Sequence, residues 1–183
     1  MNIRDLSMIN VKEIKRESII HYPEVKDLCS RPYFKHPNGC PNQEKCKNLN
    51  VPPFNVIDSF GKYTNYYLVY VIFNRKAYRE AKGGDNLRWW QGSLKKLLKE
   101  KLIEIIKNNP LITYYIYGCG SGFKLGRERG SMEHCHINVF STMKRNGVKL
   151  DLNPKNRVIL VCLISSTKPL LLNKEQYSLS GWL

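Results

Sequence analysis

The distribution of apolar residues along the chain first predicts buried strands. The segment NYYLVYVIFN, Asn65–Asn74, has aromatic and β-branched residues at consecutive positions and no glycine or proline. An apolar run of this length is far too short to cross a bilayer and is typical of a buried strand. LITYYIY (Leu111–Tyr117) and RVILVCLIS (Arg157–Ser165) have the same character. We therefore expect three buried strands.

Apolar residues between the first two runs recur at the spacing of an amphipathic helix. Within Gly84–Pro110 they stand three or four positions apart, at Leu87, Trp90, Leu94, Leu97, Leu98, Leu102, Ile105 and Ile106. Asp85 or Asn86 can cap the start of this helix, and two asparagines before the final proline mark its end. The opposite face carries lysines, which in most helices form only a solvated surface.

Weaker patterns complete the predicted fold. RKAYREAK, residues 75–82, reads as a short helix ended by two glycines, and SMEHCHINVFSTMKRNG as a helix that Ser131 caps and Gly147 ends. The mixed pattern of residues 1–26 fits a strand or a short helix. Strands that alternate with helices predict an α/β fold, a single-domain layered sheet over 1–183 with its core at 64–166. We expect at least partly parallel strand pairing in this sheet.

A long N-terminal cysteine loop, residues 27–56, has no periodic pattern and contains Cys29, Cys40 and Cys46. Ten residues separate the first two cysteines and five separate the second two. Structural zinc sites more often use pairs about two to four residues apart, whereas dispersed thiolates suit an iron–sulfur cluster. Because disulfides are disfavoured in a reducing compartment, we interpret the three thiols as metal ligands. The predicted cofactor is a [4Fe-4S] cluster, with zinc as the alternative.

The fourth ligand is left open by the sequence. Cys119, directly after a predicted strand, could supply it, or one iron could stay open to a substrate. Cys135 would lie in the first turns of the predicted helix, where the helix N-terminus favours a thiolate. Cys162 stands within an apolar run and is expected to be a core thiol. Further possible ligands are His36, His134 and His136, although each is more often an ordinary polar residue.

Two acids could donate a proton near the loops, Glu44 and Glu133, although either is more often a surface or capping residue. The glycine-rich GCGSGFKLGRERG, residues 118–130, follows a strand but matches neither the P-loop nor the dinucleotide-binding pattern. An anion could still bind where basic residues precede the predicted helix, at Lys124, Arg127 and Arg129. No Ser/His/Asp arrangement indicates a conventional hydrolase.

The charge of the chain points to polyanions. Its 30 Lys and Arg residues outnumber 15 Asp and Glu residues, which gives a net charge of +15. Such a charge attracts nucleic acid or another polyanion, although a lysine-rich surface without a specific partner is the alternative. The N-terminal residues mix charges with apolar side chains and lack the apolar region of a secretory signal. We expect a cytoplasmic protein without a membrane segment.

Two segments resemble the motifs of a known family. GCPNQEKCKNLNVPPF is similar to a Cys-Pro-Asn-Tyr-Gly motif followed by Cys-Pro-Pro, and GSMEHCHINVF to Ser-Met-Glu-Ala-x-Gly-Ile-Asn-Val. Both motifs belong to uncharacterised predicted metal-binding proteins of bacteria and archaea. The resemblance covers roughly residues 25–165 and implies an iron–sulfur or other metal site.

This sequence departs from the family pattern at two places. Val51 stands where the family has the cysteine of Cys-Pro-Pro, while Cys46 lies inside the spacer. The second cysteine group of the family, ahead of Ser-Met-Glu, is reduced to Cys119. The ligands implied by the resemblance therefore carry over to Cys40 and, less closely, to Cys29.

Three functions remain open at this point. The first is an iron–sulfur protein whose open iron serves sulfur or redox chemistry on a nucleotide or RNA-like substrate, which looks like the chemistry of thiouracil desulfidases. The second is a non-catalytic, metal-stapled nucleic-acid-binding module, in which Trp89, Trp90 and tyrosines stack bases while lysines contact phosphates. The third is a protein-interaction domain with a purely structural metal. Whether the protein is an enzyme is left open.

Overall fold

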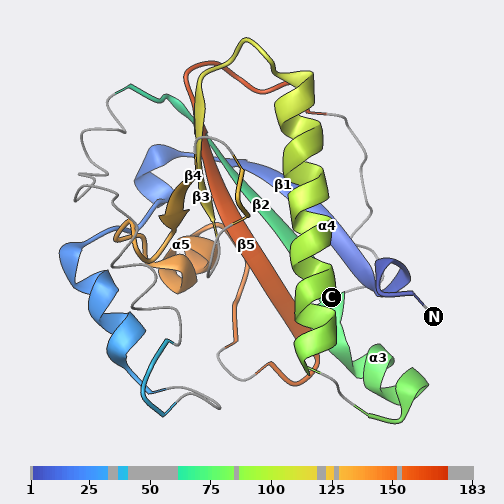
Figure 1. The fold of residues 1–183 in the computed structure, drawn as a ribbon. Helices are drawn as coiled ribbons and strands as arrows, with labels where there is room; N and C mark the ends of the chain where they lie inside the picture. The colour runs from blue at the N-terminus through green and yellow to red at the C-terminus, as the bar shows by residue number, and fades with distance from the viewer. Residues whose placement is uncertain are drawn as a thin grey trace.

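A mixed five-stranded sheet forms the centre of the computed structural model, with its strands in the order β1-β2-β5-β3-β4 (Figure 1). The structure describes residues 2–32, 37–40, 62–84, 87–118, 123–125, 128–151 and 154–172. The strands are β1 (Ser7–Ile14), β2 (Asn65–Asn74), β3 (Tyr114–Gly118), β4 (Glu128–Ser131) and β5 (Arg157–Ser166). The predicted α/β class is thus confirmed, and the three apolar runs form β2, β3 and β5.

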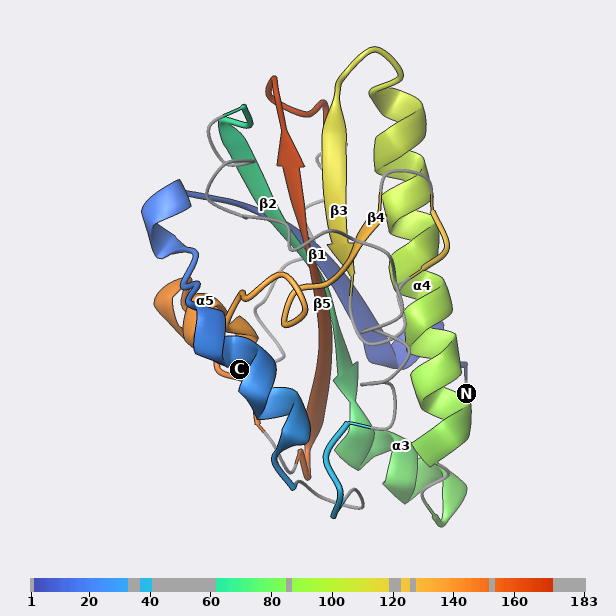
Figure 2. The same cartoon turned by 60° about the vertical axis from the view of Figure 1, so that its left-hand side comes forward.

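Helices cover both faces of this sheet. Its α-helices are α3 (Arg75–Lys82), α4 (Leu87–Asn108) and α5 (Val139–Arg145), and its 3-10 helices are η1 (Arg4–Leu6), η2 (Arg16–Ser18) and η3 (Pro23–Ser30). The long helix α4 lies along one face of the sheet, while α5 and η3 lie on the opposite side (Figure 2). The chain is therefore built in three layers, helix, sheet and helix.

Three of the four strand pairings are antiparallel, and only β3 and β4 pair in parallel. The helical connection through α4 does set β2 and β3 in the same direction, as expected of a β-α-β unit. The last strand, β5, lies between them and runs antiparallel to both. Parallel pairing therefore occurs only at the edge of the sheet, over a short stretch with a register shift.

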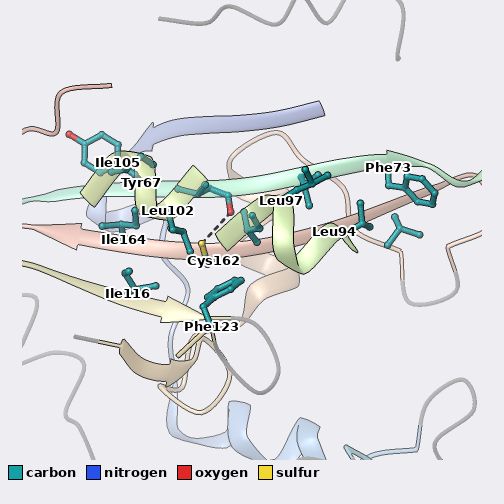
Figure 3. Packing of buried hydrophobic residues seen from close by; sticks show 14 of the residues in the cluster. Tyr67, Phe73, Leu94, Leu97, Leu102, Ile105, Ile116, Phe123, Cys162 and Ile164 are labelled. Atoms are coloured by element: carbon teal, nitrogen blue, oxygen red, sulfur yellow. Dashed lines mark hydrogen bonds between the residues drawn. The ribbon is translucent and has the colours of Figure 1, made fainter. Parts of the chain in front are cut away.

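Both faces of β2 are buried, which explains its unbroken apolar sequence. Its alternate residues Tyr67, Val69, Val71 and Phe73 join the hydrophobic cluster beneath α4 (Figure 3). The intervening residues Tyr66, Leu68, Tyr70 and Ile72 join a second cluster on the opposite face. Cys162 is fully buried in the first cluster with its Sγ 3.5 Å from the Val69 carbonyl oxygen, which confirms it as a core thiol.

The helix that Ser131 was expected to cap begins seven residues later, since its cap is Asn138. Ser131 ends β4, and helix α5 begins at Val139 with Asn138 as its cap, whose side chain accepts a hydrogen bond from the Ser141 N–H at 2.9 Å. The physical reason is His136, whose φ of 62° is left-handed and cannot continue a helix. Cys135 is consequently not at a helix N-terminus but is buried in the second hydrophobic cluster.

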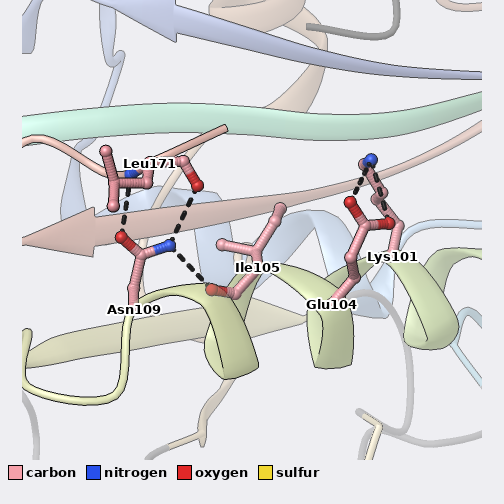
Figure 4. A network of polar contacts seen from close by, with 5 residues as sticks. All are labelled: Lys101, Glu104, Ile105, Asn109 and Leu171. Atoms are coloured by element: carbon pink, nitrogen blue, oxygen red, sulfur yellow. Dashed lines mark hydrogen bonds and ion pairs between the residues drawn. The ribbon is translucent and has the colours of Figure 1, made fainter. Parts of the chain in front are cut away.

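The end of α4 is tied to the C-terminal side of β5 by one buried side chain (Figure 4). Asn109 Nδ2 donates to the carbonyl oxygens of Ile105 at 2.8 Å and Leu171 at 3.1 Å, and its Oδ1 accepts from the Leu171 N–H at 2.8 Å. The amide therefore ends the helix, as predicted, and also fixes the segment after β5.

We expect Asn109→Ala to lower the free energy of unfolding by about 1–3 kcal/mol, because it leaves buried backbone groups without partners. The matched control is Asn108→Ala at the exposed last residue of α4, which should change the same quantity by less than about 0.5 kcal/mol. Urea unfolding measures both variants. Equal effects of the two substitutions would contradict this role for Asn109.

Candidate functional site

Most of the predicted cysteine ligands lie outside the described residues. This applies to Cys46, Cys119 and the side chain of Cys29, whose backbone belongs to η3, and also to His36 and Glu44. Cys40 is described; it is partly exposed and follows Gly39, which has a left-handed φ of 82°. Within the described ranges, no three His, Cys, Asp or Glu side chains are grouped so as to hold one metal ion. The iron–sulfur site therefore stays a prediction.

Three of the four histidines of the chain lie in two segments that the fold pairs, and the charge of His136 acts on both His21 and His134. We call His21, His134 and His136 the histidine cluster. The segment at His21 pairs with that at Ile137 through an isolated antiparallel bridge. The Tyr22 N–H donates to the His136 carbonyl oxygen at 3.1 Å, and the Asn138 N–H donates to the Ile20 carbonyl oxygen at 2.8 Å. Two loops far apart in sequence are thereby held side by side.

A tight turn after β4 positions His134 and His136. The Ser131 hydroxyl accepts a hydrogen bond from the His134 N–H at 3.1 Å, and the Ile137 N–H donates to the Met132 carbonyl oxygen at 2.9 Å. The side chains of Met132 and Ile137 are fully buried and anchor the turn in the second hydrophobic cluster. The two histidines between these anchors remain partly exposed.

Gly130 is required where this turn leaves the sheet. Its φ is 100°, a conformation that residues with a Cβ rarely adopt. A Cβ at this position would also lie 3.3 Å from Cδ2 of the His134 ring. The close approach of the ring to the backbone therefore needs a glycine.

Two of the three imidazoles, those of His21 and His134, favour the neutral form. Burial lowers the pKa of His21, and the nearby positive charges of Arg16 and protonated His136 lower it further. Burial and the charge of His136 likewise lower the pKa of His134. His136 is thus electrostatically coupled to both of the others. A neutral imidazole keeps a nitrogen lone pair, which is what a metal ion binds.

Glu133, the only predicted catalytic acid in the described residues, lies in the same turn. Burial raises the pKa of its carboxyl group, although hydrogen bonds from its own backbone N–H and from the Ser131 side chain oppose the shift. The Glu133 carbonyl oxygen also accepts a hydrogen bond from the His136 N–H at 2.9 Å. A carboxyl group with a raised pKa keeps its proton to a higher pH than an ordinary glutamate and is therefore better suited to donate one.

A depression of about 490 Å³ opens beside His21. It is lined by Arg16, Glu17, Ile19, Ile20, His21 and Arg145. Hydrogen bonds fix its two walls to each other: the Ile20 N–H donates to Thr142 Oγ1 at 3.0 Å, and Asn146 Nδ2 donates to Ser18 Oγ at 3.1 Å. Two arginines against one glutamate make the depression favourable for an anion.

In the described part of the glycine-rich segment, the helix N-terminus on which the expected anion site depended is missing. That site needed a helix N-terminus directly after Arg129, but α5 begins at Val139. The Glu128 carboxylate accepts hydrogen bonds from the Phe123 N–H at 2.7 and 3.0 Å and from the Leu125 N–H at 3.3 Å. An internal carboxylate thus occupies those backbone donors. Arg127 and the side chain of Arg129 lie outside the described residues.

No protein-family model, no curated protein and no solved structure matches the chain when these are compared with it. The resemblance to the predicted metal-binding family therefore stays a prediction that depends on the two motifs. Among the helices that the structure describes, none has the length and apolar character needed to cross a membrane.

The sequence pointed to His134 and His136 but missed His21, Arg16 and Arg145. The spacing of His134 and His136, one residue apart, is a local signal for a histidine site. His21 carries no such signal, since it reaches the cluster only through the bridge to Ile137. The arginines also lie in different elements and meet only in the fold.

We expect the free energy of unfolding to fall as the pH is lowered through the unfolded histidine pKa of about 6.5. Folding lowers the pKa of His21 and His134, so the unfolded chain binds protons first and is favoured by acid. The contribution of these histidines to the free energy of unfolding should be fully present above this pH. It should decrease as the pH falls below about 6.5 and approaches the lower pKa values of the folded state.

The measurement is urea unfolding at several pH values between 8 and 5 in a Glu133→Gln background. This background is needed because the raised pKa of Glu133 gives the opposite slope, with stability that falls as pH rises. Adding His21→Asn and His134→Asn should flatten the pH dependence. An unchanged slope would show that these histidines are not its source.

Proposed function

We propose that this protein binds nucleic acid and uses the histidine cluster to hold a divalent transition-metal ion for chemistry at a phosphodiester bond. The observation that carries the proposal is the gathering of three electrostatically coupled histidines from two distant loops beside an arginine-lined depression. The steps that follow concern metal binding, phosphate binding and the reaction.

Metal binding is supported by the chemistry of the cluster. Neutral imidazole is a common ligand of zinc and other first-row transition metals, and burial favours the neutral form of His21 and His134. The three rings as placed do not converge on one ion. Metal binding would therefore require the rings, each of which is partly exposed, to change rotamer so that their nitrogens face one ion. Three imidazoles would leave a coordination position for water or a phosphate oxygen.

Phosphate binding is supported by charge. The chain has a net charge of +15, which favours association with nucleic acid through counterion release. Arg16 and Arg145 line the depression beside His21. Guanidinium groups match phosphate oxygens with paired donors, so these two arginines are the residues that would position the backbone.

The reaction that this arrangement supports best is phosphodiester hydrolysis. A bound metal ion supplies a Lewis acid that polarises a phosphoryl oxygen. Water attacks phosphorus, one P–O ester bond breaks, and the leaving oxygen takes a proton. Glu133 is the candidate donor of that proton, because burial raises its pKa and it shares a turn with two of the histidines.

Isothermal titration with Zn²⁺ and Mn²⁺ tests the metal site. Loss of a residue that only supports a metal ligand typically weakens metal binding about 10- to 100-fold. We expect His134→Ala and His136→Ala, which remove proposed ligands, to weaken binding by at least as much. His21→Ala should also weaken it. Glu24→Gln, which changes an exposed carboxylate on η3, is the control and should bind as the native chain does.

Cleavage of labelled DNA and RNA should require added metal ion and should be lost in Glu133→Gln, with urea unfolding to check that this variant keeps its fold. Cleavage that survives both a chelator and the triple histidine substitution would overturn the proposal. Metal binding unchanged in all three histidine variants would do the same.

A second candidate function is favoured by the environment of Cys40. The other thiols in the described part of the chain, Cys135 and Cys162, are buried in hydrophobic clusters, whereas Cys40 is partly exposed and belongs to neither cluster. We propose that Cys40 binds an iron–sulfur cluster together with Cys29, Cys46 and either Cys119 or a substrate. Such a cluster would serve sulfur or redox chemistry on a nucleotide or RNA-like substrate, with zinc as the alternative metal.

Anaerobic reconstitution tests this second candidate. The expected result is brown protein that contains iron and acid-labile sulfide, with loss of both in Cys40→Ser. Cys135→Ala is the matched control, since its thiol is buried in the core, and should keep the colour. Protein that stays colourless after reconstitution would rule the cluster out.

A further inference from the structure

Two exposed aromatic side chains lie beside the histidine cluster. In the described residues, the large apolar side chains exposed to solvent are Tyr22 at 39%, Leu111 at 97%, Phe140 at 40% and Leu171 at 73%. The two aliphatic ones belong to the chain segments that Asn109 joins. Single exposed apolar residues are ordinary. The two aromatic ones differ because Tyr22 follows His21 and is hydrogen-bonded to Asn138, the cap of α5, while Phe140 stands in the first turn of that helix.

Tyr22 is held in place at both ends. Its backbone N–H donates to the carbonyl oxygen of His136, and its hydroxyl accepts a hydrogen bond from Asn138 Nδ2 at 2.6 Å. Asn138 is itself fixed as the cap of α5. The ring is exposed, but these contacts already restrict its rotation. It therefore loses little conformational entropy when a ligand stacks on it.

Phe140 stands in the first turn of α5 and points to solvent. Its neighbours Val139, Thr142 and Met143 are buried, so the exposed residues of this helix are Phe140 and, one turn further, Lys144 and Arg145. Of these, Arg145 lines the depression with Arg16. One helix thus presents an aromatic ring and cations on adjoining positions.

We infer that Tyr22 and Phe140 stack unpaired bases of a single-stranded nucleic acid whose phosphates lie at Arg16 and Arg145. The inference rests on the proposed function and names the form of the substrate. Aromatic faces beside cations are the elements that single-strand-binding surfaces use. In a duplex the faces of the bases are covered by their neighbours, so protein rings cannot reach them. The structure thus favours single strands over duplexes.

Fluorescence anisotropy with labelled oligonucleotides tests the inference on the full chain, with EDTA present to prevent cleavage. The probes are a single-stranded DNA, an RNA of the same sequence and the corresponding duplexes. We expect tighter binding to one of the single strands than to either duplex. Tyr22→Ala and Phe140→Ala should each weaken single-strand binding by about tenfold and leave duplex binding unchanged.

Matched variants separate stacking from folding. Tyr22→Phe keeps the ring without the hydroxyl and should retain most of the affinity, whereas Phe140→Leu keeps the apolar bulk without the ring and should not. Leu111→Ala removes an exposed apolar side chain away from the cluster and should bind as the native chain does. Urea unfolding of each variant checks that the fold is kept.

The outcomes distinguish this inference from the proposed function. Equal, salt-dependent affinity for single strands and duplexes, unchanged in Tyr22→Ala and Phe140→Ala, overturns the inference but leaves metal-assisted cleavage standing. Absence of binding to every nucleic acid overturns both. Single-strand preference that depends on the two rings supports the inference even if no metal binds, and the DNA and RNA probes then show which polymer is preferred.

Discussion

The burial of both faces of β2 is the constraint on which the rest of the structure depends. A strand with eight consecutive buried residues needs cover on each side, and α4 supplies it on one face. The opposite face is covered by shorter elements, including α5 and the turn that follows β4. Met132 and Ile137 bury themselves there, and the two histidines between them are carried to the surface as a consequence. The candidate site therefore lies where it does because the turn that carries its histidines also covers the second hydrophobic cluster.

Backbone pairing between two loops then completes that site. The segment Ile20–Tyr22 is aligned against Ile137 and its neighbours by hydrogen bonds that do not depend on side-chain identity. The side chains of these loops can therefore differ without a change in how the two backbones pair. This is common for functional sites on loops that a rigid scaffold supports. Histidines, arginines and aromatic rings come from this frame and from α5, while the sheet beneath supplies only support.

The strong elements of the fold could be predicted from the sequence because their burial is continuous. The strand Asn65–Asn74 and the helix ending at Asn108 follow directly from unbroken and periodic apolar patterns. The short polar strand Glu128–Ser131 could not, since its four residues carry no apolar pattern and its pairing with β3 is tertiary. The start of α5 was misplaced because Ser131 looks like a cap, and only the left-handed backbone at His136 shows that the helix must begin later. Of the site, the pair His134 and His136 was visible, but the partners contributed by distant segments were not.

The position of β5 between β2 and β3 has a consequence for how the chain folds. Among the described strands it is the last to be synthesised, yet it supplies the hydrogen bonds for the inner edges of both neighbours. Until β5 is synthesised, the apolar strands β2 and β3 have open edges, and such edges are prone to pair with other chains. The native pairings also join residues nearly a hundred positions apart, as between Val69 and Cys162, which makes folding slow relative to a helical protein of this size. The order of synthesis thus leaves these edges of β2 and β3 unpaired until β5 has been made.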